Sequence, residues 1–179
     1  LFENDLLTFN GTPDDVRRTV ERLGLEIVTF QPFRDFEGMP ENRRERVFQR
    51  AERKFDIMQE LGCKLLMVCS NVSPESLGGI DRAAADLREL GERAAKRGLR
   101  VGFEALSWGR HINEYTTAWA AVEAADCPNL GLCIDSYHVL ATNTPLDPLD
   151  DVDPEKIFFV QLADFMWSQV RTPEERRDT

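Results

Sequence analysis

Three apolar segments of the chain end in a side chain that carries an oxygen ligand. The segment RVGFE ends in Glu104, NLGLCID ends in Asp135, and IFFVQ ends in Gln161. A buried carboxylate at the end of a strand is costly unless a cation, a hydrogen-bonding partner or water meets it. Because the pattern occurs three times, we expect the three side chains to share one site. Each alone could instead be a surface residue or half of an ion pair with an arginine.

The expected site has the composition of a metal centre. Carboxylate and amide oxygens without thiolates suit Mg²⁺, Mn²⁺ or Co²⁺ better than a structural zinc ion. We therefore predict a divalent metal held by Glu104, Asp135 and Gln161. A fourth ligand is expected, and no other residue of the chain is a clear candidate for it.

The only two histidines of the chain follow the two carboxylates. His138 comes three residues after Asp135, on the loop expected to leave that strand, and His111 follows Arg110 in SWGRH. A histidine beside a metal-bound carboxylate can act as a general acid or base near neutral pH. We predict a catalytic role for His138 and, with weaker support, for His111. A structural position in a loop is the alternative for both.

Three further residues stand where a substrate pocket is expected. Arg34 in QPFRDFEG and Arg110 in SWGRH could each grip a substrate carboxylate in a two-pronged fashion, although surface arginines are common. Asn71 in VCSNVS follows a strand and could line the pocket or shape a turn. The sequence contains no nucleophile elbow, P-loop or CxxC motif.

The elements that must position these residues alternate between strand-like and helix-like segments. We expect strands at residues 25–30, 64–70, 100–105, 130–136 and 157–164, and the end of another at residues 1–3. Helices are expected from Pro13 after the cap Thr12, from Pro40 to Gly62, in a region beginning at Ser73 that is surest over residues 80–94, and after Asn113.

This alternation predicts a parallel sheet with right-handed crossovers, either an open doubly wound sheet or a closed eightfold barrel. No GxGxxG motif follows a strand, which weakens a dinucleotide-binding interpretation. Acidic side chains at several neighbouring strand ends favour the α/β fold of the (β/α)8 TIM barrel, because only a closed barrel aims them at one axis. We expect residues 1–179 to form one partial domain of this kind.

The composition is ordinary for a soluble globular protein, with an acidic balance. The chain has 22 Lys and Arg residues against 32 Asp and Glu residues, a net charge of −10, which disfavours a nucleic-acid partner. Four cysteines without CxxC spacing are expected to be buried free thiols in a reducing compartment. No apolar run approaches ~18 residues, so we expect a cytoplasmic protein without a membrane span. The start at Leu1 and the polar end RTPEERRDT lead us to expect that both ends are cut.

Several longer segments together resemble a known family. The segments are FENDLLTFNG, FQPFRDFEG, AERKFDIMQELG, VCSNVSPE, FEALSWGRHIN, LGLCIDSYHVL and IFFVQLAD. They closely resemble bacterial 3-dehydroshikimate dehydratases, which belong to the xylose isomerase-like, AP endonuclease family 2 barrels. The resemblance covers nearly the whole chain. It implies a divalent-metal (β/α)8 barrel that dehydrates 3-dehydroshikimate, a small molecule, to protocatechuate in quinate and shikimate breakdown.

The resemblance also implies roles for individual residues. Glu104, Asp135 and Gln161 match three metal ligands, and the fourth, a glutamate on the final strand, is expected beyond Thr179. Residues 1–3 would then be the tail of the second barrel strand, with the first and the eighth strands absent. His138 is implied as the base that takes the proton next to the substrate carbonyl.

Other roles and functions stay open in the sequence. Arg34, with Arg110, would hold the ring carboxylate, while His111 could contact the substrate, donate a proton or do neither. A sugar isomerase or ketose epimerase on the same barrel is the nearest alternative activity. A non-catalytic binding barrel is the alternative of another class, and the oligomeric state is not indicated.

Overall fold

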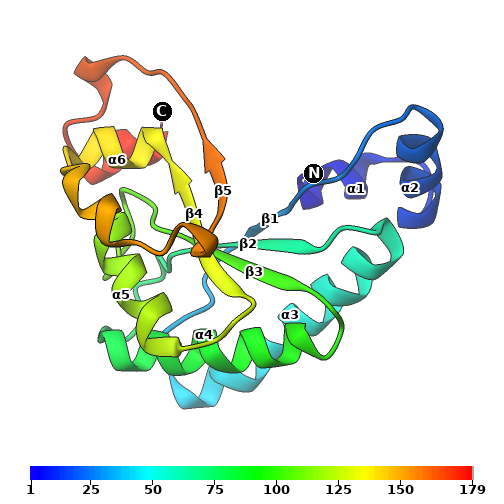
Figure 1. The fold of residues 1–179 in the computed structure, drawn as a ribbon, viewed down its shortest axis with the longest axis horizontal. Coiled ribbons are helices and arrows are strands. Elements are labelled where there is room, and N and C mark those ends of the chain that lie inside the picture. The colour runs from blue at the N-terminus through cyan, green and yellow to red at the C-terminus, as the bar shows by residue number, and fades with distance from the viewer. Residues whose placement is uncertain (179) are drawn as a thin grey trace.

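The computed structural model describes residues 1–178, with the side chain of Gln169 excepted. Five short segments, four of them largely buried, form one parallel sheet (Figure 1). The strands are β1 (Phe30–Phe33), β2 (Leu65–Cys69), β3 (Arg100–Glu104), β4 (Leu130–Asp135) and β5 (Ile157–Gln161), and they lie side by side in chain order. The prediction of a parallel α/β sheet is therefore confirmed.

Helices join successive strands and cover one face of the sheet. These are α3 (Glu41–Leu61), α4 (Ile80–Ala95) and α5 (Tyr115–Ala125), with the shorter α6 (Ser136–Thr142) and the 3-10 turns η1 (Asp147–Asp151) and η2 (Pro154–Lys156) between β4 and β5. At the two ends lie α1 (Glu3–Thr8) and α2 (Pro13–Arg22), and then η3 (Trp167–Gln169) and α7 (Pro173–Asp178). Figure 1 shows α1 and α2 as an arm beside the C-terminal part of α3, which α2 contacts and whose Lys54 pairs with Glu3 of α1.

The local signals for two helices act as expected. The Thr12 hydroxyl accepts the backbone N–H of Asp15, and the Asp15 carboxylate accepts the N–H of Thr12, which is a capping box at the start of α2. Gly62 ends α3 with φ 72°, a left-handed conformation that glycine adopts without steric cost.

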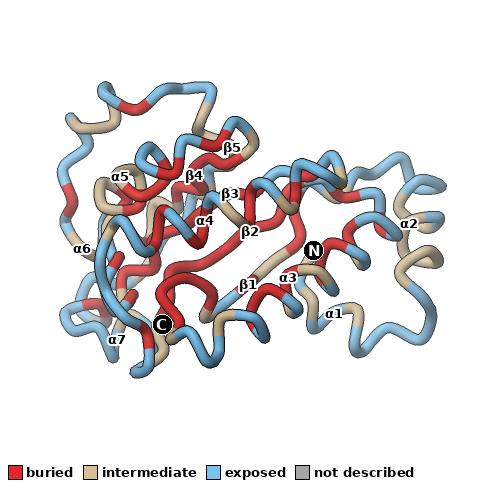
Figure 2. Tube along the Cα trace, turned by 90° about the horizontal axis from the view of Figure 1, so that it is seen from below, coloured by how far each residue is buried: buried red, intermediate tan, exposed pale blue. Residues whose placement is uncertain are grey.

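The two faces of the sheet have different neighbours. Leu66 and Val68 on β2, with Phe103 on β3, belong to the core that packs against the helices. Successive side chains of a strand point to opposite faces, so Cys69 and Glu104 lie on the other face. Figure 2 shows that β1 to β4 form the buried centre of the molecule, while α2 has no buried residue.

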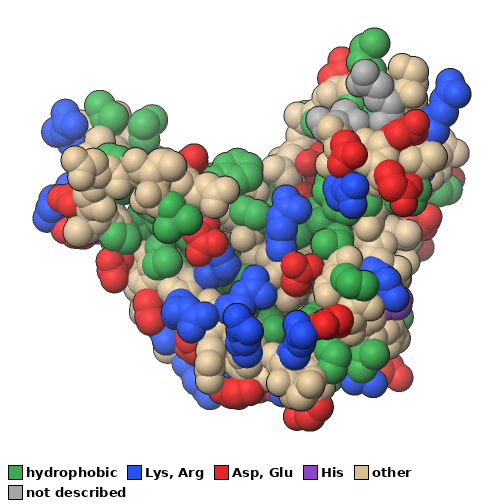
Figure 3. Space-filling view, turned by 180° about the vertical axis from the view of Figure 1, so that it is seen from behind, with side chains coloured by type: hydrophobic (Ala, Val, Ile, Leu, Met, Phe, Trp, Pro, Cys, Tyr) green, Lys and Arg blue, Asp and Glu red, His purple; other side chains and the backbone are tan. Residues whose placement is uncertain are grey.

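The sheet is open, with β1 and β5 at its edges. The outer strand β5 is mostly half-buried. Val160 in this strand and Leu162 just after it leave 54% and 87% of their surface exposed. Seen from behind, the molecule is hollowed between the α1–α2 arm and the part that carries the C-terminus (Figure 3). Five parallel strands with two open edges agree with the expected incomplete barrel.

The first predicted strand is displaced along the chain. Phe30 of β1 pairs with Leu66, the second residue of β2. In this register, the residues before Thr29 lie beyond the start of β2, so they have no β2 residue to pair with. Residues 25–29 are not part of a strand, and β1 runs from Phe30 to Phe33. The expected strand end at residues 1–3 is a single parallel bridge between Phe2 and Gln31, followed at once by α1.

Two helix predictions are also corrected. The helical region expected from Ser73 is only a turn there, and α4 begins at Ile80 after Gly78 and Gly79, which disfavour a helix. His138 does not lie on a loop, because α6 starts directly after β4. The Asp135 carboxylate accepts the backbone N–H of Tyr137 at 2.8 Å and caps this helix.

Among the described residues, no helix combines the length and the apolar character needed to cross a lipid bilayer.

Candidate metal centre

The strand register brings the predicted ligands to one edge of the sheet. Cys69 pairs with Glu104, Glu104 with Cys133, and Asp135 with Gln161. Partners in a parallel sheet point to the same face, and Asp135 lies two residues after Cys133, so all five side chains share the face that the helices leave uncovered. The carboxyl ends of the strands therefore gather two carboxylates, an amide and two thiols.

Glu104 is the centre of this group and is only 4% exposed. Its Oε1 accepts a hydrogen bond from Gln161 Nε2 at 2.9 Å, and its Oε2 accepts one from Cys69 Sγ at 3.2 Å. The same Nε2 lies 3.4 Å from Asp135 Oδ2. One ligand atom each from Glu104, Asp135 and His138 lie within 4.8 Å of one another. The structure thus brings together the three predicted metal ligands and the predicted catalytic histidine.

The electrostatics of the two carboxyl groups favour a bound cation. The pKa of Glu104 is raised to about 7, mainly by burial and also by the negative charge of Asp135, while the hydrogen bonds from Cys69 and Gln161 and the charge of Arg34 oppose the shift. Burial also raises the pKa of Asp135, while the Tyr137 amide opposes that shift. Both carboxyl groups therefore have raised pKa values. A metal ion bound between them would stabilise both in the ionised form. Because the donors are oxygens, with an imidazole nearby, the residues present fit a metal ion.

His138 is buried and held by the loop that follows β3. Its Nδ1 accepts the backbone N–H of Ser107 at 3.2 Å and lies 3.2 Å from the Ser107 hydroxyl. An amide N–H can only donate, so this contact favours the neutral ring with its proton on Nε2. The other tautomer would place the proton on Nδ1, where the hydroxyl can accept it. Burial, together with the charge of Arg34, lowers the pKa of His138 to about 4, so the ring is neutral at pH 7.

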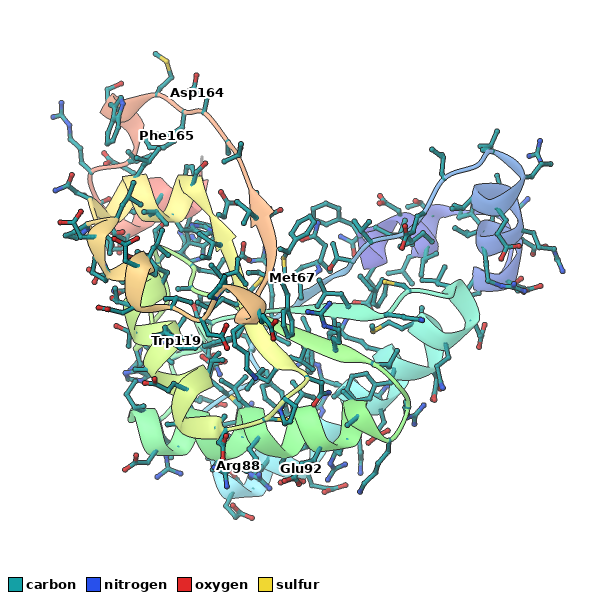
Figure 4. The ribbon with its side chains drawn as sticks, in the orientation of Figure 1. Met67, Arg88, Glu92, Trp119, Asp164 and Phe165 are labelled. Atoms are coloured by element: carbon teal, nitrogen blue, oxygen red, sulfur yellow. The ribbon has the colours of Figure 1, made fainter. Side chains whose placement is uncertain are left out.

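Aromatic rings surround His138. The ring centroids of Trp108 and Tyr137 each lie 5.1 Å from that of His138, in edge-to-face geometry. Phe165 lies in the segment after β5 (Figure 4), and its ring centroid is 5.0 Å from that of Tyr137. These rings contribute to the burial that, together with the charge of Arg34, lowers the pKa of His138.

Sequence reasoning missed four residues of this site. Cys69 ends KLLMVC as Glu104 ends RVGFE, so its strand-end position was the available signal. Ser107 and Trp108 follow a ligand strand, and Tyr137 precedes His138, but nothing in their spacing indicated contact with the imidazole.

The predicted substrate-binding residues occupy different environments. Arg34 is exposed on the loop after β1, and its charge acts on both Glu104 and His138. Asn71 is buried, and its side chain donates to the backbone carbonyl of Glu37 at 2.6 Å, while its own N–H donates to Glu37 Oε1 at 2.6 Å. Asn71 therefore ties the loop after β2 to the loop that carries Arg34.

Arg110 and His111 are exposed and contact the loops rather than the carboxylates. The Arg110 N–H donates to the carbonyl of Asn71 at 2.9 Å. His111 Nε2 lies 2.9 Å from the Ser76 carbonyl, and its ring packs on Gly78. Catalytic or binding roles for these two residues stay predictions.

A separate hollow of the described surface lies away from the strand ends. It has a volume of about 730 Å³, is lined by α3, α4 and α5, and includes Glu52, Arg88 and Glu92. Figure 4 shows Arg88 and Glu92 on the side of α4 that points away from the sheet. Its walls carry paired surface charges, such as Arg93 with Glu52, and contain no strand-end residue. We therefore place the candidate site at the strand ends and not in this hollow.

Glu37 gives a prediction about stability. Its Oε2 has no hydrogen-bond partner among the described residues, and burial raises its pKa to about 8, with further contributions from Asp86 and Asp35. The folded carboxyl keeps its proton up to about pH 8, whereas in the unfolded chain the carboxyl has its ordinary pKa of 4.5 and releases the proton near that pH. Between these values the folded state binds more protons, so the free energy of unfolding falls as pH rises.

We expect Glu37→Gln to remove this pH dependence. A glutamine keeps an oxygen for the Asn71 N–H and cannot ionise. From pH 5 to pH 8, the free energy of unfolding should fall by at least about 1.4 kcal/mol more in the wild type than in the variant. Urea unfolding at both pH values measures this difference, and equal pH slopes would contradict the prediction.

Comparison with known proteins agrees with this geometry. The profile of the xylose isomerase-like TIM barrel family matches residues 2–177. A 3-dehydroshikimate dehydratase of Pseudomonas aeruginosa is 56% identical over 164 residues, which are 92% of this chain and 26% of that protein. One from Pseudomonas putida is 52% identical over the same shares. The chain thus spans about a quarter of the length of these curated relatives.

A solved structure has the same architecture. It is a xylose isomerase-like TIM barrel/4-hydroxyphenylpyruvate dioxygenase fusion protein, 52% identical, with a TM-score of 0.90 over 91% of this chain and 26% of that one. The family match extends over nearly all of the chain, and the five parallel strands in chain order agree with part of a barrel. The chain therefore belongs to the xylose isomerase-like TIM barrel family.

Proposed function

We propose that the protein dehydrates 3-dehydroshikimate to protocatechuate with a divalent metal. The observation that carries this proposal is the buried group of Glu104, Asp135 and Gln161 beside His138. The group occurs in a chain 56% identical to a 3-dehydroshikimate dehydratase. Two carboxylates, an amide and a neutral imidazole are the groups that a metal-assisted elimination next to a carbonyl needs.

We propose Glu104, Asp135 and Gln161 as ligands of Mg²⁺, Mn²⁺ or Co²⁺. The bound metal would polarise the substrate carbonyl and stabilise the negative charge that develops on its oxygen. Gln161 would present its amide oxygen, which needs only a turn of the amide group because oxygen and nitrogen occupy equivalent positions. Asp135 would use the carboxylate oxygen that does not cap α6.

His138 is proposed as the group that takes the proton next to the carbonyl. Its ring is neutral at pH 7 because burial and the charge of Arg34 lower its pKa, so it is available as a base. To accept a proton at Nε2, the ring must leave the tautomer that the Ser107 N–H favours and carry its own proton on Nδ1, where the Ser107 hydroxyl can accept it. Loss of this carbon-bound proton and of the β-hydroxyl releases one water, and enolisation then gives the aromatic catechol.

The substrate carboxylate is assigned to Arg34. Arg34 is exposed at the mouth of the site, and its charge acts on both Glu104 and His138, so a bound carboxylate there would lie beside the reacting groups. Asn71 supports this assignment indirectly, because it anchors the loop of Arg34 through Glu37.

Arg110 and His111 are proposed to contact only the outer part of the substrate. We keep the cytoplasm as the predicted location, in line with four buried free cysteines.

The proposal is tested with the complete protein loaded with Mg²⁺, Mn²⁺ or Co²⁺ in turn. We expect 3-dehydroshikimate to be converted with a rise in catechol absorbance, and a chelator to abolish the rise until metal is added back. A metal-loaded protein that leaves 3-dehydroshikimate unchanged but isomerises a ketose sugar would contradict the proposal and favour the isomerase alternative.

A further inference from the structure

A thiol at the end of β2 lies against the central carboxylate of the site. Cys69 Sγ is 3.2 Å from Glu104 Oε2, and the two residues are 2% and 4% exposed. A carboxylate can only accept, so the thiol donates this hydrogen bond. The contact follows from the sheet itself, because Cys69 and Glu104 are partners in the register of β2 on β3.

The two oxygens of Glu104 are held differently. Oε1 accepts from Gln161 Nε2 at 2.9 Å, and Oε2 accepts from Cys69. When Gln161 turns its amide oxygen towards a metal, its NH₂ group can no longer hold Oε1, whereas the bond between Cys69 and Oε2 requires no change. The thiol is then the remaining described donor to this carboxylate.

We infer that Cys69 is a positioning residue of the metal centre, which holds Oε2 of Glu104 so that Oε1 faces the metal. The inference rests on the proposed metal site. Glu104 then binds the metal through one oxygen, and the thiol fixes the rotation of the carboxylate about the Cγ–Cδ bond of Glu104. Cys69 itself does not touch the metal.

The expected size of the effect follows from other metal sites. Groups that hydrogen-bond to ligands typically change metal affinity by about 10- to 100-fold when they are removed. A thiol is a weak donor, so we expect the lower end of this range for Cys69. A serine hydroxyl in the same place is a stronger donor than a thiol, although its C–O bond is shorter than the C–S bond of cysteine. We therefore expect it to largely replace the hydrogen bond of the thiol.

Another buried cysteine provides a matched control. Cys133 on β4 is the register partner of Glu104 on the other side, and its Sγ packs over Gly102, where an added Cβ would lie 2.3 Å from the sulfur. Cys133→Ala therefore removes the same atom from the neighbouring strand without removing the donor to Oε2 of Glu104.

The experiment measures Mn²⁺ and Co²⁺ affinity in the complete protein by competition with a chelator. We expect Cys69→Ala and the volume-filling Cys69→Val to bind about tenfold more weakly. Cys69→Ser and Cys133→Ala should stay within about threefold of the wild type, since the first keeps a donor and the second does not touch Oε2. Because serine and valine differ in hydrogen bonding, the comparison does not depend on the alanine variant folding well.

Three results would contradict the role of Cys69, and only the third would also contradict the proposed function. Equal affinity of Cys69→Val and the wild type overturns the role of Cys69 and leaves the proposed function intact. A thiolate-to-cobalt charge-transfer band in the wild type that Cys69→Ser loses makes Cys69 a ligand, which also overturns it. A wild type that binds no metal overturns both the inference and the proposed function.

Discussion

Replacing Glu104 by glutamine in the complete protein is expected to remove both the bound metal and the turnover of 3-dehydroshikimate. The substitution keeps the size of the side chain but removes the negative charge at the centre of the cluster, where Gln161 and Cys69 already direct donors. Metal stabilisation of a developing oxyanion is worth several kcal/mol. Its loss, at about 4 kcal/mol, lowers kcat/KM roughly 10³-fold.

Two measurements check this expectation. Metal analysis should find substoichiometric metal in Glu104→Gln, and the catechol assay should find the loss in turnover. Glu123→Gln on the exposed side of α5 is the matched control and should retain both. If Glu104→Gln keeps its metal and its turnover, Glu104 is not a ligand and the proposed function loses its basis.

Replacing His138 by asparagine should lower kcat by about 10²- to 10⁴-fold while the metal stays bound. The asparagine oxygen can still accept the Ser107 N–H that His138 Nδ1 accepts, so the fold around the site is preserved. Proton transfer is lost because an amide does not ionise near neutral pH. Metal content separates the two possible roles of this histidine: retention agrees with a base, and loss would make His138 a ligand in place of Gln161.

The chain's other histidine allows the same substitution in a different environment. His111 is exposed and contacts Ser76 and Gly78 instead of the carboxylates. We expect His111→Asn to lower kcat less than about tenfold, below the usual contribution of a general acid or base. A loss as large as that of His138→Asn would give His111 the catalytic role that its position in the sequence first indicated.

The ligand strands could be predicted from sequence because their signals are local. Glu104, Asp135 and Gln161 each close an apolar run, and parallel strands bring their carboxyl ends to one edge. The first strand was misplaced because its limits depend on register: the pairing of Phe30 with Leu66 decides which residues have a neighbour, and no local pattern contains that information.

The groups that tune the site were not predictable in the same way. The contact of Ser107 with His138 joins the loop after β3 to α6, 31 positions apart in the chain. The bond from Cys69 to Glu104 spans 35 positions and requires the exact pairing of β2 with β3. Residue type and spacing identify which side chains can bind a metal, whereas the packed structure determines which neighbours adjust their pKa values and orientation.

The order of the sheet has a consequence for how the site is made during synthesis. Each strand lies beside the strand that precedes it in the chain, so β2, β3 and β4 can pair as they leave the ribosome, without waiting for a distant segment. Cys69 and Glu104 then meet first, Asp135 joins them with β4, and Gln161 arrives last, 57 residues after Glu104. A nascent chain would hold its carboxylates in place before it has the third ligand with which to retain a metal.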